Sequence, residues 1–238
     1  MKPRLPLHNK IALITGASRG IGLAIAQALG GQGCDVIITG REALALQKAA
    51  KQIGTKAVPV VCDVGEPKSV QNLLATVKKR FGRLDILINN AGVAHANIKV
   101  ADLPLQTWNG VIETNLTALF LVTQAALPLM KSGAAIVNNL SVAAKRVFPG
   151  LSAYNAAKHG ALGFTDTLRE ELRDKGIRVI ALLPGATDTE IWDEMWPDAP
   201  RKKMMSAKTV AQAVVNALAL PEDCTLEELV IRPSVGTL

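Results

Sequence analysis

Aromatic side chains are scarce in this chain of 238 residues, and their scarcity limits what the protein can bind. Phe, Trp and Tyr together make up 3% of the sequence. Proteins that bind single-stranded nucleic acid stack bases on clustered aromatic rings. The formal net charge of +7 comes from scattered Lys and Arg residues, of which Arg201-Lys202-Lys203 is the longest cluster. A nucleic-acid interface needs a coherent basic patch, so the sequence predicts no nucleic-acid partner and favours anionic small molecules.

Cysteine and histidine are also rare, with three residues of each. The cysteines Cys34, Cys62 and Cys224 are odd in number, widely spaced and in no C-x-x-C arrangement. This usage is typical of reduced thiols in a cytoplasmic protein. The histidines show no metal-ligand spacing. The sequence therefore predicts no metal site.

The sequence shows no long uninterrupted hydrophobic run, although hydrophobic residues make up 49% of the chain. No apolar stretch is predicted to be long and uninterrupted enough to cross a bilayer. The first ten residues are polar and broken by prolines, without the apolar core of a signal peptide. The C-terminus carries no lipidation motif. We therefore expect a cytoplasmic protein without a membrane partner.

The apolar residues that are present are mostly Ala, Val, Ile and Leu, as in a parallel sheet buried under helices on both faces. Runs of strand length occur at Ile11–Thr15, Val36–Thr39, Ala57–Cys62, Ile86–Asn89, Ala135–Leu140, Val179–Leu183 and Leu229–Ile231. Helical patterns occur at Ile21–Leu29, Glu42–Ile53, Pro67–Phe81, Leu105–Met130, Ala153–Lys175 and Thr209–Leu220. This alternation predicts one doubly wound α/β Rossmann domain over residues 1–238, with a parallel sheet of about seven strands.

One stretch after mid-chain, Thr187–Ala207, fits neither pattern and is expected to be irregular. Loops of this length are often lids over a binding site. It contains Trp192 and Trp196 in a chain with few aromatic residues. The sequence therefore predicts a short lid over an apolar ligand.

A glycine-rich segment from Thr15 to Gly22 follows the first strand and opens the first helix. Glycines permit a tight turn and close approach of the backbone to a phosphate, whose charge the helix N-terminus favours. The spacing G-x-x-x-G-x-G departs from the usual fingerprint, and a plain connector is the alternative. Its place in the first β-α unit favours a dinucleotide site. The expected binding residues are Gly16, Ser18, Arg19, Gly20, Ile21 and Gly22.

The end of the second strand distinguishes between the two nicotinamide dinucleotides. NAD-binding folds place a carboxylate there, whereas this chain reads Ile38-Thr39-Gly40-Arg41. A guanidinium suits a 2′-phosphate through charge-assisted bonds, and Arg19 could reach the same group. Solvated surface charges are the alternative. We therefore favour NADP(H), while the neighbouring Glu42 keeps NAD(H) open as the less favoured cofactor.

The single tyrosine, Tyr154, precedes Lys158 by four positions, so both side chains share a face if this segment is helical. A phenol ionises near pH 10, and lowering its pKa by about three units needs roughly 4 kcal/mol. A cation about 4 Å away supplies energy of that order at an effective dielectric near 20. The pair could exchange protons near neutral pH. A packed tyrosine beside a solvated lysine is the alternative for a bare Tyr-x-x-x-Lys.

Taken together, these motifs resemble the short-chain dehydrogenase/reductase superfamily, from about residue 9 to residue 232. Asp63-Val64, Asn89-Asn90-Ala91-Gly92, Asn115, Ser141 and Pro184-Gly185 complete the family's order. Within the superfamily the chain looks most like the 3-oxoacyl-[acyl-carrier-protein] reductase type. The resemblance implies that Asp63 and Val64 meet the adenine. It also implies that Asn90, Ala91, Gly92, Pro184, Gly185 and Thr187 line the rest of the cofactor, the last three at the nicotinamide.

The resemblance also implies a catalytic tetrad of Asn115, Ser141, Tyr154 and Lys158. Tyr154 would be the general acid and base, and Ser141 would hold the same substrate oxygen. Lys158 would support the tyrosine and bind the nicotinamide ribose. Asn115 would hold a water through its backbone carbonyl, at a distortion of its helix.

The implied function is NADP(H)-dependent hydride transfer between the nicotinamide and a carbonyl or secondary alcohol. Three substrate readings stay open: an acyl-carrier-protein thioester docked by Arg201-Lys202-Lys203, another small ketone or sugar, or a steroid-like alcohol. For the basic cluster itself, a solvated turn is the favoured reading and docking is the alternative. A non-catalytic NADP(H)-binding sensor or scaffold is the alternative of another class. The resemblance further suggests a homodimer or homotetramer built from the two longest helices and the C-terminal strand.

Overall fold

The sheet of this protein is a seven-stranded, fully parallel one with the order β3-β2-β1-β4-β5-β6-β9. The computed structural model describes residues 7–221 and 223–236. The strands are β1 (Ile11–Thr15), β2 (Asp35–Gly40), β3 (Ala57–Val61), β4 (Ile86–Asn89), β5 (Ala135–Asn139), β6 (Arg178–Pro184) and β9 (Glu228–Ile231). The predicted fold class is confirmed, with strand ends within one residue of the prediction.

Burial explains which strands lie in the centre of the sheet. Every residue of β1 and β4 is buried, as expected of continuous apolar strands covered on both faces. β3 lies at one edge, and it contains Pro59, which has no backbone N–H to donate to a further strand. β9 forms the other edge and is only partly buried.

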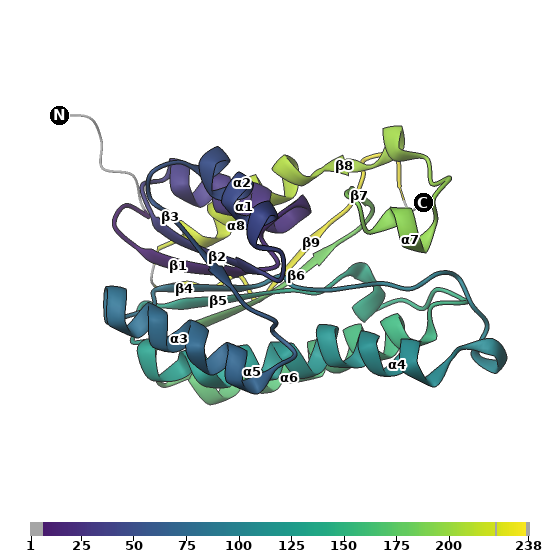
Figure 1. Ribbon diagram of the computed structural model, residues 1–238, viewed down its shortest axis with the longest axis horizontal. Helices are drawn as coiled ribbons and strands as arrows, with labels where there is room; N and C mark the ends of the chain where they lie inside the picture. The colour runs from purple at the N-terminus through teal and green to yellow at the C-terminus, as the bar shows by residue number, and fades with distance from the viewer. Residues whose placement is uncertain (1–6, 222, 237–238) are drawn as a thin grey trace.

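Helices cover both faces of the sheet, as Figure 1 shows. On one face lie α1 (Gly20–Gly31), α2 (Ala43–Ile53) and α8 (Ala207–Leu218). On the other face lie α3 (Pro67–Phe81), α4 (Leu105–Ile112), α5 (Ala118–Ala126) and α6 (Ser152–Arg173). Two apolar clusters fill the layers between sheet and helices, one on each face.

The helix that begins at Leu105 is continuous to Leu129, but it is not regular. Between α4 and α5 runs a π-helical turn, Glu113–Thr117, and a short 3-10 turn ends the helix at Leu127–Leu129. By length and composition this 25-residue helix could cross a membrane, with a mean hydropathy of 1.3 in its most apolar window. The statement that no stretch is long and apolar enough is therefore wrong by this measure. In the structure the helix packs against α3 and α6 over the sheet.

The segment Thr187–Ala207, called the lid below, is more ordered than the sequence predicts. It holds β7 (Thr187–Asp188), α7 (Trp192–Met195), a 3-10 turn (Arg201–Lys203) and β8 (Met205–Ser206), with β7 and β8 paired in parallel. Local contacts explain this order. The Trp192 indole donates to the Thr187 carbonyl at 2.9 Å, and the Trp192 and Trp196 rings pack 6.4 Å apart.

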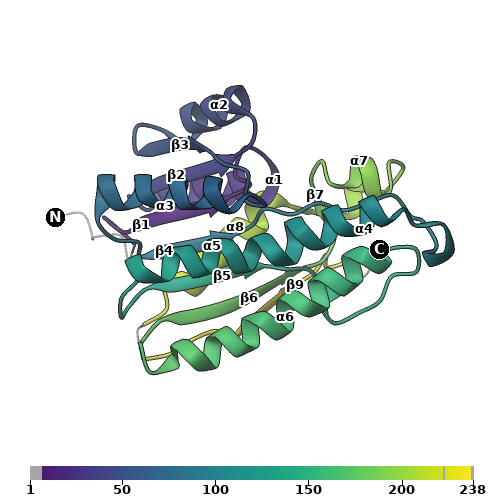
Figure 2. The ribbon, with the colours of Figure 1, turned by 60° about the horizontal axis from the view of Figure 1, so that its bottom comes forward.

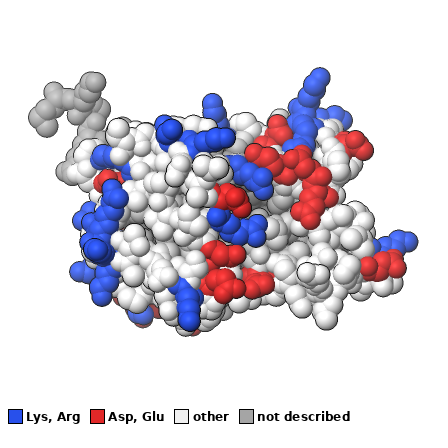
Figure 3. All heavy atoms as spheres, in the orientation of Figure 1, with Lys and Arg blue, Asp and Glu red and all other residues white. Residues whose placement is uncertain are grey.

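Lys and Arg side chains line the left edge of the face drawn in Figure 3, while over its centre and right Lys and Arg lie next to Asp and Glu. Over the centre and right of this face the charges are therefore mixed.

Candidate active site

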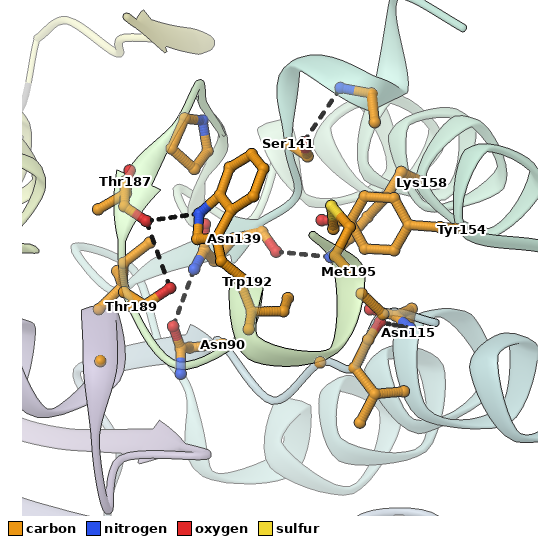
Figure 4. Close-up of a pocket in the computed structure, with 18 of the residues that line it drawn as sticks. Asn90, Asn115, Asn139, Ser141, Tyr154, Lys158, Thr187, Thr189, Trp192 and Met195 are labelled. Carbon is orange, nitrogen blue, oxygen red and sulfur yellow. Dashed lines mark hydrogen bonds between the residues drawn. The ribbon is translucent and has the colours of Figure 1, made fainter. Parts of the chain in front are cut away.

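A cavity of about 740 Å³ opens at the carboxyl ends of the parallel strands. It lies at the switch point between β1 and β4, because the chain runs from β1 outward to β2 and β3 on one side and then crosses to β4 on the other side of β1. Ligands of open α/β sheets bind at such switch points, and the volume is that of small-molecule sites. The lid closes one side of the cavity (Figure 4).

The Gly-rich turn forms the floor of one half of the cavity. Gly16 and Gly20 have φ values of 62° and 58°, a region that side-chain-bearing residues rarely adopt. A Cβ on Gly16 would come within 2.8 Å of the Ala91 Cα atom. Helix α1 begins after Arg19 without a side-chain cap, so its first N–H groups face outward from the turn. Uncapped N–H groups at a helix N-terminus suit a phosphate.

The structure brings the sequence-predicted cofactor residues together around this cavity, with one exception. Gly22 does not line it, because it lies beneath the turn. A Cβ there would approach the Gly16 carbonyl oxygen to 2.6 Å and collide with the Asn90 side-chain amide. The residues that do line it are Gly16, Ser18, Arg19, Gly20, Ile21, Arg41, Asp63, Val64, Asn90, Ala91, Gly92, Pro184, Gly185 and Thr187, with the four predicted catalytic residues.

The residues expected at the adenosine end lie at the rim of the cavity. Arg19 and Arg41 are both exposed there, so their guanidinium groups are accessible to a ligand phosphate. Asp63 is exposed as well, and its carboxylate accepts a hydrogen bond of 3.0 Å from the backbone of Gly65. The fit is that of an anionic, adenosine-bearing ligand.

Tyr154 and Lys158 lie in the first turns of α6 and face the cavity from the same side (Figure 4). They are 7% and 5% exposed. The Lys158 ammonium stands 5.4 Å from the centre of the Tyr154 ring and donates to the Asn139 carbonyl at 3.3 Å. Burial lowers the pKa of Lys158 to about 8, because a dry environment disfavours its charged form.

The effect of the site on the tyrosine differs from the expectation. Burial raises the pKa of Tyr154, and a hydrogen bond with the Ser141 hydroxyl only partly opposes that rise. The reason is geometric, because the ammonium stands over the face of the ring. The lysine also gives up its own proton near pH 8. At neutral pH Tyr154 therefore keeps its proton, which makes it a proton donor first.

Ser141 lies two residues beyond the end of β5 and caps a short 3-10 turn, Val142–Ala144. Its Oγ accepts a hydrogen bond of 3.1 Å from the Ala143 backbone. This bond uses an acceptor lone pair, so the hydroxyl proton is not taken up by the backbone and can be directed to Tyr154 or to a ligand oxygen beside it. Ser141 can therefore hold an oxygen atom that Tyr154 protonates.

Asn115 lies inside the π-helical turn, at the distortion that the resemblance implies. Its side-chain amide donates to the carbonyls of Val93 and Val111, at 2.8 and 2.9 Å. Its Oδ1 is buried without a hydrogen-bond partner among the described residues. π turns mark functional sites because they interrupt the regular hydrogen-bond ladder. Here the turn places Asn115 beside Gly92, on the cofactor loop.

Comparison with known proteins agrees with this geometry. The family model described as short chain dehydrogenase matches residues 10–200. The chain belongs to the short-chain dehydrogenase family. The curated protein "Dehydrogenase/reductase SDR family member 4" of Bos taurus is 35% identical over 229 residues, which are 94% of this chain and 81% of that protein.

Solved structures of short-chain dehydrogenases have the same fold. An alcohol dehydrogenase from the archaeon Thermococcus sibiricus, complexed with 5-hydroxy-NADP, superposes with a TM-score of 0.90 at 30% identity, over 97% of this chain and 99% of that one. The 3-ketoacyl-(acyl-carrier-protein) reductase from Brucella melitensis, complexed with NADH, gives 0.88 at 27% identity, over 96% and 98%. This chain is therefore an oxidoreductase of the family, with a nicotinamide cofactor.

Two residues of this short-chain dehydrogenase site were missed by the sequence analysis. Asn139 lines the cavity and bonds to Asn90 (Figure 4). Its signal was available, because residues two apart in a strand share a face and Ser141 is two positions further on. Thr189 also lines the cavity, two residues after Thr187 in the lid. No signal distinguished it from an ordinary loop threonine.

Within residues 7–221 and 223–236, no group of three His, Cys, Asp or Glu side chains could hold a metal ion. The polar groups that line the cavity are mostly amides, hydroxyls, guanidinium groups and an ammonium, with the carboxylates of Asp63, Glu190 and Glu194. These groups suit an organic, phosphate-bearing cofactor.

Proposed function

We propose that this short-chain dehydrogenase is an NADP(H)-dependent reductase of a small apolar ketone, working reversibly on the corresponding secondary alcohol. The observation that carries the proposal is the convergence of Ser141, Tyr154 and Lys158 on one wall of the cavity, between the Gly-rich turn and the lid. A proton donor, an oxygen-holding hydroxyl and a cation at one point are what carbonyl reduction needs.

The residues perform the proton chemistry of this reaction. When bound, the dinucleotide supplies the hydride that the carbonyl carbon accepts. Tyr154 holds its proton at neutral pH and passes it to the carbonyl oxygen, while the Ser141 hydroxyl donates a hydrogen bond to that oxygen. Lys158 places its positive charge beside the phenolate that forms. The backbone at Asn115 holds the water through which Tyr154 regains a proton.

The choice of NADP(H) rests on Arg19 and Arg41, which stand exposed at the adenosine end of the cavity. Guanidinium groups bind a 2′-phosphate by charge-assisted bonds. Arg41→Asp should shift the preference toward NADH, measured as the ratio of kcat/KM values for the two cofactors. An unchanged ratio would remove Arg41 from the phosphate site.

The preference for an apolar ketone rests on the far half of the cavity. The lid contributes Trp192, Met195 and Trp196 to its wall, and Phe148 and Leu151 stand in the wall as well. A carrier-protein substrate is the second candidate, and Lys202 and Lys203 are exposed in the lid. Turnover with acetoacetyl thioesters, free ketones, aldehydes, sugars and steroid alcohols distinguishes these readings.

Catalysis itself is tested by Tyr154→Phe. The variant should bind NADPH nearly as the wild type does and lose two or more orders of magnitude in turnover, roughly the contribution of a general acid. Near-wild-type turnover would refute the proposal. If the wild type binds NADPH and turns over no carbonyl compound in the panel, the sensor or scaffold reading takes its place.

We propose a cytoplasmic homotetramer as the working form. All three cysteines are free, which suits a reducing compartment. Phe120 is exposed on α5 and packs edge-on against Phe164 of α6, and Val230 is exposed on the edge strand β9. These apolar surfaces on two helices and one sheet edge suit contacts between copies. Sedimentation velocity measures the state, and a monomer at micromolar concentration would refute it.

A further inference from the structure

Two asparagine pairs link the ends of β4 and β5, one pair on each face of the sheet. Asn89 and Asn138 are opposite each other in the parallel register, and the Asn89 amide donates to Asn138 at 2.9 Å. The next residues along the chain, Asn90 and Asn139, point to the other face. There the Asn139 amide donates to the Asn90 oxygen at 2.8 Å.

Backbone atoms fix the orientation of the second pair. The Asn90 amide nitrogen donates to the carbonyls of Thr15 and Gly16, at 2.9 and 3.0 Å. Carbonyl oxygens only accept hydrogen bonds. The side-chain oxygen of Asn90 must therefore face Asn139, and Asn139 must donate to it through its amide nitrogen (Figure 4).

This orientation leaves the other atom of the Asn139 amide unused. Its Oδ1 is buried without a hydrogen-bond partner among the residues that the structure describes. A buried acceptor without a partner costs stability, and such a group in a folded protein calls for a functional explanation. The Asn139 side chain therefore keeps the orientation that bonds to Asn90, although this leaves its own oxygen without a partner among the described residues.

The backbone of Asn139 continues the connection. Its carbonyl accepts the hydrogen bond of 3.3 Å from Lys158. A chain of three hydrogen bonds therefore runs from the Gly-rich turn through Asn90 and Asn139 to the Lys158 ammonium. Lys158 is buried and its pKa is lowered to about 8, so a fixed acceptor changes its protonation near working pH.

We propose that Asn139 is a positioning residue, which couples occupation of the Gly-rich turn by the dinucleotide to the protonation of Lys158. The inference rests on the proposed cofactor site. The Asn139 side chain ties the Gly-rich turn, through Asn90, to the end of β5, and the Asn139 backbone carbonyl at that strand end accepts from the ammonium. A bound phosphate that orders the turn steadies this strand end, and with it the carbonyl that holds the ammonium.

The test measures the dissociation constant of NADPH between pH 7 and pH 9.5 by the fluorescence of the tryptophans, without turnover. Affinity for the anionic ligand should fall as Lys158 loses its proton, so the midpoint of the curve reports that proton. Asn139→Leu should weaken binding at pH 7 by about fivefold or more, the effect of one hydrogen bond. It should also move the midpoint to lower pH, because the residue 139 carbonyl, which remains in the variant and accepts from the ammonium, is no longer tied to Asn90 through its side chain.

Asn139→Asp keeps the size of the side chain and adds a negative charge near Lys158, so it should move the midpoint to higher pH while also weakening binding. Asn138→Leu is the matched control on the opposite face. It should lower the melting temperature, since Asn138 is bonded to Asn89 and Thr165, and leave the midpoint unchanged.

Opposite shifts in the two Asn139 variants, absent in the control, support the proposal. An unchanged midpoint in Asn139→Asp, or equal shifts in Asn138→Leu, would overturn it and leave the proposed function standing. If Asn139→Leu does not fold, the isosteric Asp variant decides alone. Wild-type protein that binds no NADPH would overturn both proposals.

Discussion

The two halves of the cavity are built on different physical principles. In the catalytic half, Tyr154 and Lys158 are buried polar groups on the long helix α6, next to strand β5. In the lid half, Trp196 is 45% exposed, and Arg201 at 27% exposure holds the segment by ion pairs at the surface. Buried groups are costly and tightly placed, whereas exposed ion pairs contribute about 0–1 kcal/mol each. The catalytic residues thus lie in the tightly packed half of the cavity. Substitutions in the lid half can alter the substrate preference at a small cost in stability.

The largest effect on the catalytic half is expected from Lys158→Met, which removes the positive charge of the side chain and keeps much of its length. Turnover should fall about 100-fold or more, because the phenolate of Tyr154 loses its neighbouring cation. The melting temperature should stay the same or rise, since an ammonium no longer has to be buried. Steady-state kinetics and thermal melting measure both. A large loss of stability would show that Lys158 stabilises the fold, which contradicts the view of the catalytic half as built from buried groups that cost stability.

Gly22→Ala attacks the same half from below the turn. The added Cβ would collide with the Asn90 amide and approach the Gly16 carbonyl to 2.6 Å, which displaces the turn. We expect the NADPH dissociation constant to rise about tenfold or more, with a lower melting temperature, as for overpacking in a core.

Gly31→Ala is the matched control, at the other end of α1. Nothing lies within 4 Å of a Cβ at that position. It should leave NADPH binding unchanged. Equal effects of the two variants on binding would mean that the helix, rather than the turn, responds to the added methyl group.

The catalytic half was also the easier half to predict from sequence. Tyr154 and Lys158 are four apart in a helix, and the turn follows a strand, so local spacing placed both. Local spacing could not give the direction in which the pKa of Tyr154 shifts, because burial depends on the whole fold and outweighs the hydrogen bond with Ser141. Asn139 was missed for a related reason, since its role depends on pairing with a residue 49 positions away.

The lid half was predicted in place and composition but not in structure. The order of this segment comes from the Trp192 contacts and from Arg201, whose guanidinium joins Asp188 and Asp193 at 3.1 and 2.6 Å. No periodicity announces contacts of this kind. The cluster Arg201-Lys202-Lys203 could be read from the sequence as a docking site, because a sequence shows a charged residue without showing its ion-pair partner.

The pH dependence of stability offers a smaller effect that is specific to the catalytic half. The pKa of Lys158 falls from 10.5 to about 8 in the folded protein. Between these values the unfolded chain binds more protons, so stability should rise with pH by up to about 1.4 kcal/mol per unit. The measurement is urea unfolding of wild type and Lys158→Met from pH 7.5 to 9.5. The difference between the two should grow with pH in favour of the wild type, and parallel curves would contradict the burial of an ionisable amine.

The smallest effects belong to the lid, where Arg201→Gln and Lys202→Gln form a matched pair. Arg201 also donates to the Thr189 carbonyl at 2.5 Å, so its loss loosens the wall beside the substrate. We expect KM for a free apolar ketone to rise about two- to fivefold with little change in kcat, in the range of exposed ion pairs. Lys202 is exposed, and its substitution should leave the free ketone unaffected.

A carrier-linked substrate turns this pair into a decision between the two substrate readings. If the basic cluster docks an acidic carrier protein, Lys202→Gln should raise KM for the carrier-linked ketone alone, and more so at low salt, where charge attraction is screened least. If the lid only shapes an apolar pocket, Arg201→Gln should affect both substrates equally and Lys202→Gln neither. We expect the second result, because Arg201 is already paired with Asp188 and Asp193. Too few unpaired cations of this cluster then remain at the rim of the cavity to bind an acidic carrier protein.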